Sequence, residues 1–215
     1  MSRDWHTWYT AYDDPTSSLA RRLAEVRRQL VALLAGSGTR PVRLLSMCAG
    51  DGRDTLPVLA AHAPHAEALL VELDPQLAAR ARDTAGRLGL AGVQVRTGDA
   101  GLVSSYVGAG PADVLLACGV FGNIPDGDLL RTVDALPGLL APGGTVVWTR
   151  GAKVPQDPSE LAGDPSEHVR DVFAGAGFAE VAFVRPDDAS YRVGVHRLAV
   201  PPAPAPAMER LFTFV

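Results

Sequence analysis

Cysteine is scarce in this sequence, with two among 215 residues, Cys48 and Cys118. Each stands in or beside an apolar run, where a free thiol packs as a small buried side chain. We therefore expect reduced cysteines and a cytoplasmic compartment rather than a disulfide scaffold. Long apolar runs are also lacking. No stretch approaches the roughly 18 apolar residues of a membrane span, and the first residues hold no apolar signal core, so we expect a soluble protein without a membrane partner.

A surplus of positive charge is the next missing feature. The chain has 20 Lys and Arg against 24 Asp and Glu, a formal net charge of −4 and a pI near 5.7. This balance provides no overall positive field for a phosphate backbone, so it disfavours a nucleic-acid partner and favours a small-molecule substrate. With 47% hydrophobic residues, the length suits one α/β domain with a full sheet core.

What is present is organised around residues 42–56, VRLLSMCAGDGRDTL. A short apolar run leads into two glycines beside acids, and a helix-like segment begins at about Arg53. A strand, a tight glycine turn and a helix in this order let backbone N–H groups approach a ligand without an intervening Cβ. We interpret the segment as the cofactor loop of an α/β fold.

Strand-like and helix-like segments alternate along the rest of the chain. Helical periodicity and capping residues predict helices at about 14–36, 53–63, 74–88, 127–140 and 166–176. Short apolar runs predict strands at about 42–47, 68–72, 93–96, 112–118 and 145–149. Two further strands, 180–185 and 191–200, are separated by a few turn residues and should pair antiparallel.

Aromatic residues are concentrated at the N-terminal end, where Trp5, Trp8, Tyr9 and Tyr12 surround His6. Two interpretations remain open: an aromatic latch that docks on the core, or a lid over a small-molecule pocket with Tyr9, Tyr12 or His6 facing the ligand. The helix that follows carries several arginines on its polar faces, which we assign to a solvated surface.

Acids stand at the ends of two predicted strands. Glu72 closes the second strand, 20 positions after Gly52, where an acid can accept hydrogen bonds from the hydroxyls of a bound ribose. Asp99 follows the third strand at the same predicted sheet edge, and we expect both acids to contact a ligand. Asp74 and Asp113 fit a helix cap and a turn.

This arrangement resembles the class I S-adenosylmethionine-dependent methyltransferases. The order of strands and helices carries the resemblance, together with residues 49–52, AGDG, which match the second half of the family's glycine motif. It implies an α/β, Rossmann-like, seven-stranded, mostly parallel sheet with an antiparallel last strand, helices on both faces and an N-terminal helical and aromatic lid. The implied divisions are 1–36 for the lid and helix, 37–200 for the catalytic domain and 201–215 for a Pro/Ala tail.

The same resemblance implies the cofactor S-adenosyl-L-methionine, with S-adenosyl-L-homocysteine as product. Ser46 stands where the family commonly has an acid, so Asp51, the Cys118 carbonyl or a lid residue is expected to contact the cofactor's amino group instead. The residues that the resemblance places at the cofactor are Ala49, Gly50, Asp51, Gly52, Glu72, Leu73, Asp99, Ala100, Cys118, Gly119 and Phe121.

Methyl transfer requires alignment of acceptor, methyl and sulfur in a pocket that excludes water. If a base is needed, His6 and His168 are the candidates. We expect Tyr9, Tyr12, Asn123 and Arg150 to face a small-molecule acceptor, in natural-product or secondary metabolism, and we expect no metal. The enzyme should act as a monomer or homodimer.

Two rival functions remain. A NAD(P)-dependent Rossmann oxidoreductase needs a third small residue in its glycine fingerprint, where this chain has Thr55, and Asp51 would repel a pyrophosphate. A catalytically inactive relative that still binds S-adenosylmethionine would keep the same pocket residues.

Overall fold

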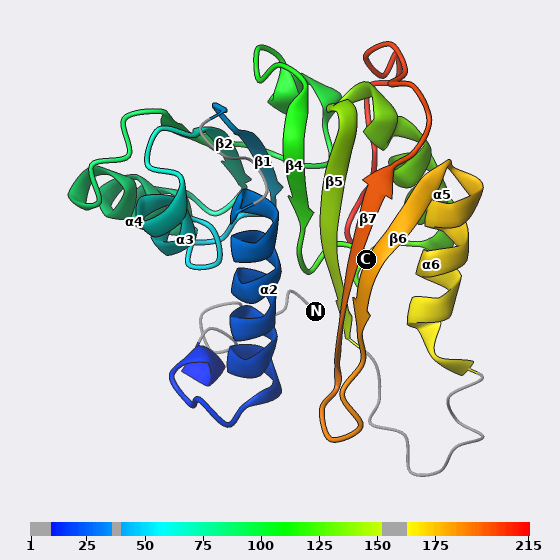
Figure 1. The fold of residues 1–215 in the computed structure, drawn as a ribbon, viewed down its shortest axis with the longest axis horizontal. Helices are drawn as coiled ribbons and strands as arrows, with labels where there is room; N and C mark the ends of the chain where they lie inside the picture. The colour runs from blue at the N-terminus through cyan, green and yellow to red at the C-terminus, as the bar shows by residue number, and fades with distance from the viewer. Residues whose placement is uncertain (1–9, 36–39, 152–162) are drawn as a thin grey trace.

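The structure, a computed structural model, describes residues 10–35, 40–151 and 163–215. Its centre is a seven-stranded sheet in the order β3-β2-β1-β4-β5-β7-β6 (Figure 1). Strand β7 pairs antiparallel with both β5 and β6, and the pairs from β3 to β5 are parallel. This confirms the predicted mostly parallel sheet with an antiparallel last strand. The strands are β1 Arg43–Met47, β2 Glu67–Glu72, β3 Val93–Thr97, β4 Ala112–Ala117, β5 Leu140–Gly151, β6 Phe178–Val184 and β7 Tyr191–Leu198.

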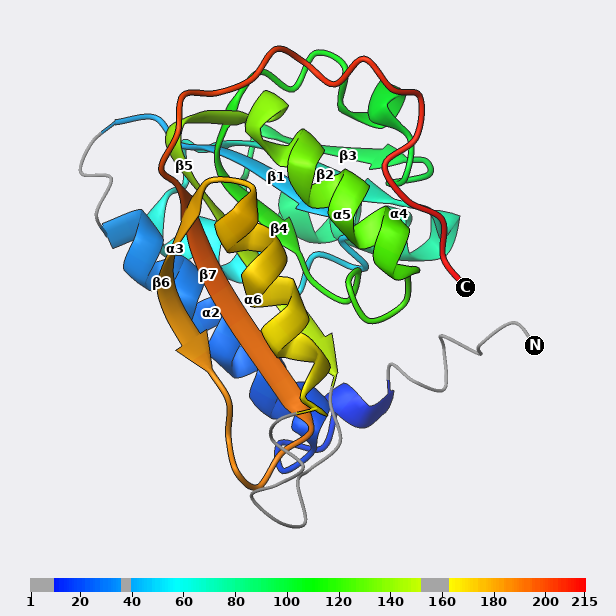
Figure 2. The ribbon, with the colours of Figure 1, turned by 90° about the vertical axis from the view of Figure 1, so that its right-hand side faces the viewer.

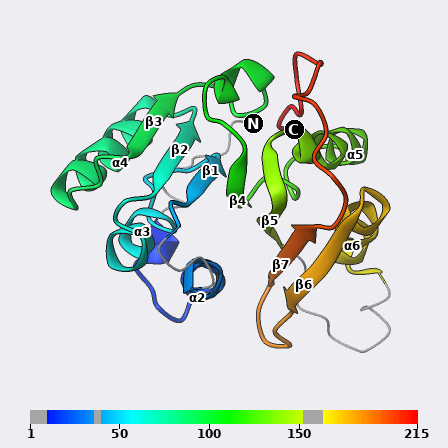
Figure 3. The same ribbon diagram turned by 45° about the horizontal axis from the view of Figure 1, so that its top comes forward.

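Helices cover both faces of the sheet (Figure 3). Helices α2, Ser18–Ala35, α3, Leu56–His62, and α4, Pro75–Arg87, share one apolar core with the sheet. Helices α5, Asp126–Ala135, and α6, Pro165–Gly175, share a second core on the other face. Successive strand residues alternate between the two cores, so that Leu44 belongs to the first and Leu45 to the second. Short 3-10 turns complete the fold: η1 Thr10–Tyr12, η2 Val103–Tyr106 and η3 Leu136–Gly138.

Side-chain caps mark the starts of α2, α4 and α6, whereas α3 and α5 have none. Asp74 caps α4, accepting hydrogen bonds from the backbone N–H groups of Gln76 and Leu77 at 2.7 and 3.1 Å, as predicted. The start predicted for α2 at Asp14 is wrong, because Asp14 closes a local turn on Thr16 and the helix begins at Ser18. Ser17 provides a cap there instead, since its Oγ accepts the Ala20 N–H at 3.0 Å.

Strand β5 is longer than predicted, and the helix before it is shorter. Helix α5 ends at Ala135, η3 follows, and β5 already begins at Leu140 rather than at Thr145. Leu140 pairs with Ala112 across a register shift in β4. The sequence signal is weak here because a Pro-Gly-Gly stretch lies inside the strand.

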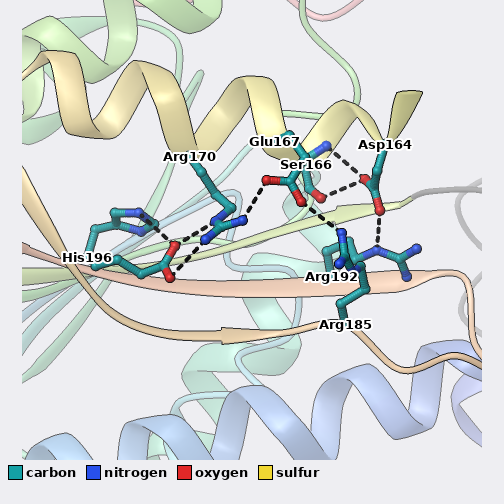
Figure 4. A network of polar contacts seen from close by, with 8 residues as sticks. Asp164, Ser166, Glu167, Arg170, Arg185, Arg192 and His196 are labelled. Atoms are coloured by element: carbon teal, nitrogen blue, oxygen red, sulfur yellow. Dashed lines mark hydrogen bonds and ion pairs between the residues drawn. The ribbon is translucent and has the colours of Figure 1, made fainter. Parts of the chain in front are cut away.

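Buried polar contacts hold α6 to β7 (Figure 4). Arg192 of β7 is fully buried, and its Nε lies 2.6 Å from Oδ2 of Asp164. The other oxygen of Asp164 accepts the Ser166 N–H at 2.9 Å at the start of α6. Asp164 therefore both pairs with a buried arginine and caps a helix, which ties the start of β7 to the start of α6.

The chain after β7 crosses back over the molecule instead of projecting into solvent. Ala203 donates its N–H to the Pro137 carbonyl, and the segment then descends beside α5, as the red trace in Figure 2 shows. Leu211 and Phe212 are buried in the core that contains α5 and α6. None of the helices in the described ranges is both long and apolar enough to cross a bilayer.

Candidate functional site

A cavity of about 350 Å³ lies at the carboxyl ends of β1, β2 and β4, between the sheet edge and α2. Its volume falls within the range of roughly 300–1,000 Å³ that small-molecule sites occupy, and its location is the usual one for ligands of open α/β sheets. The glycine turn lies at its middle. One end is largely apolar and the other carries arginines, an acid and a tyrosine, so the two ends suit chemically different parts of one ligand.

The glycine turn follows β1 directly. Cys48, Gly50 and Gly52 all have positive φ, at 53°, 59° and 74°. Gly50 lines the cavity, whereas Gly52 faces the core, where an added Cβ would lie 2.6 Å from Cδ1 of Leu56. Gly52 therefore allows α3 to pack close against the turn, and Gly50 brings the backbone to the ligand side.

Glu72 ends β2 beside this turn and is 9% exposed. Its Oε2 accepts the Gly50 N–H at 2.7 Å, and its Oε1 accepts the Asp74 N–H at 2.9 Å. Burial raises the pKa of the Glu72 carboxyl, and the two backbone donors act in the opposite direction. Each carboxylate oxygen has a second acceptor position, so Glu72 can position the turn and still bind ligand hydroxyls.

The apolar end of the cavity is formed by residues that follow β2 and β3. Leu73 is 64% exposed and Ala100 is buried, and Leu77 of α4 also lines the cavity. Asp99 is the acid of this end, and its Oδ1 accepts the Gly101 N–H at 2.8 Å. Phe214, the residue before the last, is a further lining residue of the cavity. A flat heteroaromatic group with one hydrogen-bond donor fits this combination of apolar surface and a carboxylate.

The polar end lies against α2. Nη2 of Arg22 donates to the Tyr12 hydroxyl at 3.1 Å, and the Arg53 guanidinium stacks 4.3 Å from the centre of the Tyr12 ring. Asp54 accepts the Thr55 hydroxyl at 2.9 Å, and burial raises the pKa of its carboxyl. A cationic and an anionic group are thus both available to a ligand that carries opposite charges.

Cys118 and Gly119 line the cavity after β4. The Gly119 N–H donates to the Thr149 hydroxyl of β5 at 2.9 Å, which fixes this loop against the sheet. Burial raises the pKa of both the Cys48 and the Cys118 thiol far above the physiological range. Both cysteines therefore line the site as neutral thiols and not as thiolate nucleophiles.

Known proteins share this architecture. Residues 45–146 match the model of a family described as "Methyltransferase domain". Magnesium protoporphyrin IX methyltransferase from Synechocystis PCC 6803, solved with bound S-adenosylhomocysteine, superposes with a TM-score of 0.65 at 14% identity, over 91% of this chain and 94% of that one. The N-methyltransferase NodS from Bradyrhizobium japonicum gives a TM-score of 0.60 at 18% identity, over 88% of this chain and 99% of that one. These matches identify a methyltransferase domain, and the chain has the fold of S-adenosylmethionine-dependent methyltransferases.

Curated sequence relatives of this methyltransferase are longer proteins. Ribosomal RNA small subunit methyltransferase B from Klebsiella pneumoniae is 30% identical in an alignment of 138 residues that covers 55% of this chain and 32% of that protein. The Escherichia coli protein of the same name is 31% identical in an alignment of 136 residues that covers 54% of this chain and 31% of that protein. The chain thus spans about a third of the length of the curated relatives it matches.

The cavity of the methyltransferase brings together most of the residues that the sequence places at the cofactor. The predicted cofactor residues in the lining are Ala49, Gly50, Glu72, Leu73, Asp99, Ala100, Cys118 and Gly119. Tyr12 of η1, predicted to face the acceptor, lines the same cavity. The cofactor of the family fits this donor set, because Glu72 and Asp99 suit a nucleoside and Arg22 with Asp54 suits an amino-acid group.

Other predicted residues lie elsewhere. Asp51 pairs with Arg53 at 2.6 Å beside the cavity, and Gly52 faces the core. Phe121 is the largest departure: its ring is fully buried against Trp148 and Phe173, so it supports the loop after β4 from the core side rather than lining the cavity.

Among the predicted catalytic and substrate residues that the structure describes, Tyr12 lines the cavity, whereas Asn123, Arg150 and His168 do not. Arg150 donates to the Phe121 carbonyl at 2.5 Å, and Asn123 donates to the Gly119 carbonyl at 2.7 Å. His168 is exposed on α6. His6 and Tyr9 lie outside the described residues.

Arg22, Asp54 and Phe214 are among the cavity-lining residues that were not predicted from the sequence. The prediction that the arginines of α2 lie on a solvated surface is wrong for Arg22, because Arg22 lines the cavity. Asp54 follows the glycine turn directly, a signal that could have identified it. For Phe214, the only available signal was the apolar character of the last residues.

Proposed function

We propose that this methyltransferase transfers a methyl group from S-adenosylmethionine to a small-molecule acceptor. The hydrogen bond between the Glu72 carboxylate and the Gly50 N–H carries the proposal. It brings the acid that ends β2 to the glycine turn, within one cavity whose ends differ in polarity. Such a cavity suits a ligand in which a ribose joins a nucleobase to a charged amino-acid tail, because the acid lies between the apolar and the polar end.

In this proposal the nucleoside lies at the apolar end. Glu72 accepts hydrogen bonds from the ribose hydroxyls, Leu73 and Ala100 contact the base, and Asp99 accepts a hydrogen bond from its amino group. The amino-acid tail lies at the polar end, where Asp54 faces the ammonium and Arg22 the carboxylate. Asp54 thereby takes the part of the family's usual acid, whose place in β1 is held by Ser46.

S-adenosylmethionine, when bound, supplies a methyl group on positively charged sulfur. The residues of the chain position the acceptor and exclude water, because an in-line displacement depends on alignment. Tyr12 covers the polar end, and its ring is held between Arg22 and Arg53. If the acceptor must lose a proton, we propose His6 or His168 as the base. We propose that Tyr9, Asn123 and Arg150 make further contacts with the acceptor. We place the enzyme in the cytoplasm because both cysteines are free thiols, and we propose that it acts as a monomer or homodimer.

An RNA acceptor is the second candidate, favoured by the names of the curated relatives. The net charge of −4 favours a small molecule instead. A NAD(P)-dependent oxidoreductase fits less well, because Glu72 occupies the Gly50 N–H and would place a carboxylate beside the pyrophosphate.

Methyl transfer from labelled S-adenosylmethionine separates these candidates. The protein is incubated with total RNA and, separately, with a small-molecule extract or acceptor library. Label in the small-molecule fraction alone supports the proposal, and label in RNA replaces it with the second candidate. Binding of S-adenosylhomocysteine without label in either fraction would favour a catalytically inactive relative.

A further inference from the structure

The last residues of the chain form a strap across the cofactor end of the sheet. We define the strap as residues 209–215. Its backbone joins the loop after β3, where the Glu209 carbonyl accepts the Val103 N–H at 3.0 Å and the Leu211 N–H donates to the Gly101 carbonyl at 2.7 Å. At its far end, the Val215 N–H donates to the Asn123 carbonyl in the loop after β4, at 3.0 Å. The strap therefore connects two loops that border the cavity.

Side chains and α5 fix the strap in place. Phe212 is 1% exposed, and its carbonyl oxygen lies 2.2 Å from where a Cβ on Gly101 would be, so close an approach that only glycine fits. Nε of Arg131 donates to the Leu211 carbonyl at 3.0 Å, and Asp128 of α5 accepts the Thr213 N–H at 2.7 Å. With these contacts on both sides, the strap is part of the folded domain and not a frayed terminus.

Two strap residues contact the site: Arg210 pairs with the acid of the apolar end, and Phe214 lines the cavity. Arg210 lies 2.8 Å from Oδ2 of Asp99, the oxygen opposite the one that accepts the Gly101 N–H. Phe214 lines the cavity with its ring 40% exposed, and the ring packs edge-on against Phe212 at 5.4 Å. An exposed aromatic ring that is held from behind and faces a cavity is a surface for stacking.

We infer that the strap completes the cofactor site, with Phe214 as a specificity-determining residue that covers the nucleobase and Arg210 as a positioning residue that orients Asp99. The inference rests on the proposed function. Base stacking on an aromatic ring explains why a large apolar side chain stays half open at the cavity. The ion pair explains how Asp99 keeps one orientation although its side chain is 35% exposed.

The test measures dissociation constants by calorimetry on the full chain. Wild-type protein is compared with Phe214→Ala, using S-adenosylhomocysteine, methylthioadenosine and S-inosylhomocysteine as ligands. We expect Phe214→Ala to weaken both adenosine ligands by a similar factor, roughly tenfold to hundredfold, the range of one base–aromatic stack. Met208→Ala, an exposed apolar residue just before the strap, is the matched control and should bind as wild type.

Two more variants separate ligand contact from general stability. Phe214→Leu keeps the apolar bulk that holds the strap but removes the ring face, so it should fold as wild type and still bind several-fold more weakly. Arg210→Gln should reduce the preference for the adenine over the hypoxanthine ligand, a ratio that a loss of stability does not change.

Failure of the inference is distinguishable from failure of the proposed function. If wild type does not bind S-adenosylhomocysteine, the proposed function fails. If wild type binds and the Phe214 variants bind equally well, the strap is structural and the inference is overturned. An unchanged adenine preference in Arg210→Gln would overturn the role of Arg210.

Discussion

The substitution Glu72→Gln tests the centre of the cofactor site with little change in shape. Each carboxylate oxygen of Glu72 accepts one backbone N–H, from Gly50 at 2.7 Å and from Asp74 at 2.9 Å. A glutamine amide can accept only one of these and turns its NH₂ group toward the other. The variant therefore sets one buried donor against another and loses the charge that would bind ribose hydroxyls.

The expected loss of affinity follows from these contacts. Hydrogen bonds to a charged group contribute about 1.5–3 kcal/mol, and a stranded buried donor costs about 1–3 kcal/mol. The donor mismatch is present in both the free and the bound protein and largely cancels, so the ligand contact sets the change in affinity. We expect the dissociation constant of S-adenosylhomocysteine to rise roughly tenfold to hundredfold.

The pH dependence of ligand binding provides a second test of Glu72. Burial raises the pKa of the Glu72 carboxyl above its ordinary value. The ionised form is the ligand acceptor, so wild-type affinity should fall as the pH drops through that raised pKa. The glutamine variant should lose this dependence, because it has no proton to gain.

The assay is calorimetric titration of S-adenosylhomocysteine into wild type and variant at neutral and acid pH. Glu67→Gln is the matched control, since Glu67 begins the same strand, is exposed and pairs with Arg43 at 3.2 Å. The control should bind as wild type. Equal affinity and equal pH dependence of Glu72→Gln and wild type would refute the assigned role of Glu72.

Two further predictions concern stability. Burial lowers the pKa of His196 to about 4. The unfolded chain takes up this proton near pH 6.5, before the folded protein does. The free energy of unfolding should therefore fall by up to roughly 3 kcal/mol as the pH drops from about 6.5 to 4. His196→Gln, which keeps an acceptor for Nε1 of Trp148, should flatten that fall in urea titrations, and an unchanged slope would contradict this origin. Asp164→Ala leaves the buried Arg192 without its carboxylate partner and should lower the free energy of unfolding by about 3–5 kcal/mol. Asp187 is exposed, so the control Asp187→Ala should have little effect. Equal urea midpoints for Asp164→Ala and wild type would show that the ion pair does not stabilise the fold.

Local rules were sufficient to predict much of the fold. The glycine turn, the cap at Asp74 and the antiparallel last strand follow from residue types at fixed spacings, and each is present. Glu72 could be placed because a strand end and a glycine turn in one sheet meet at one edge. These features depend on neighbours in sequence or on the regular geometry of a parallel sheet.

The missed features depend on tertiary contacts. Helical periodicity separates the buried and polar faces of α2 but does not tell which arginine meets a cavity, so Arg22 could not be distinguished from Arg21, which pairs with Asp188. The strap has no helical or strand periodicity, and its backbone partners are loops far away in sequence. The apolar character of the last residues was therefore not enough to predict that Phe214 lies at the site.

The most direct test of the account is calorimetric titration of the wild-type protein with S-adenosylhomocysteine and, in parallel, with NAD⁺ and NADP⁺. The account predicts one site per chain for S-adenosylhomocysteine and no binding of either dinucleotide. Saturable binding of a dinucleotide together with no heat from S-adenosylhomocysteine would contradict it.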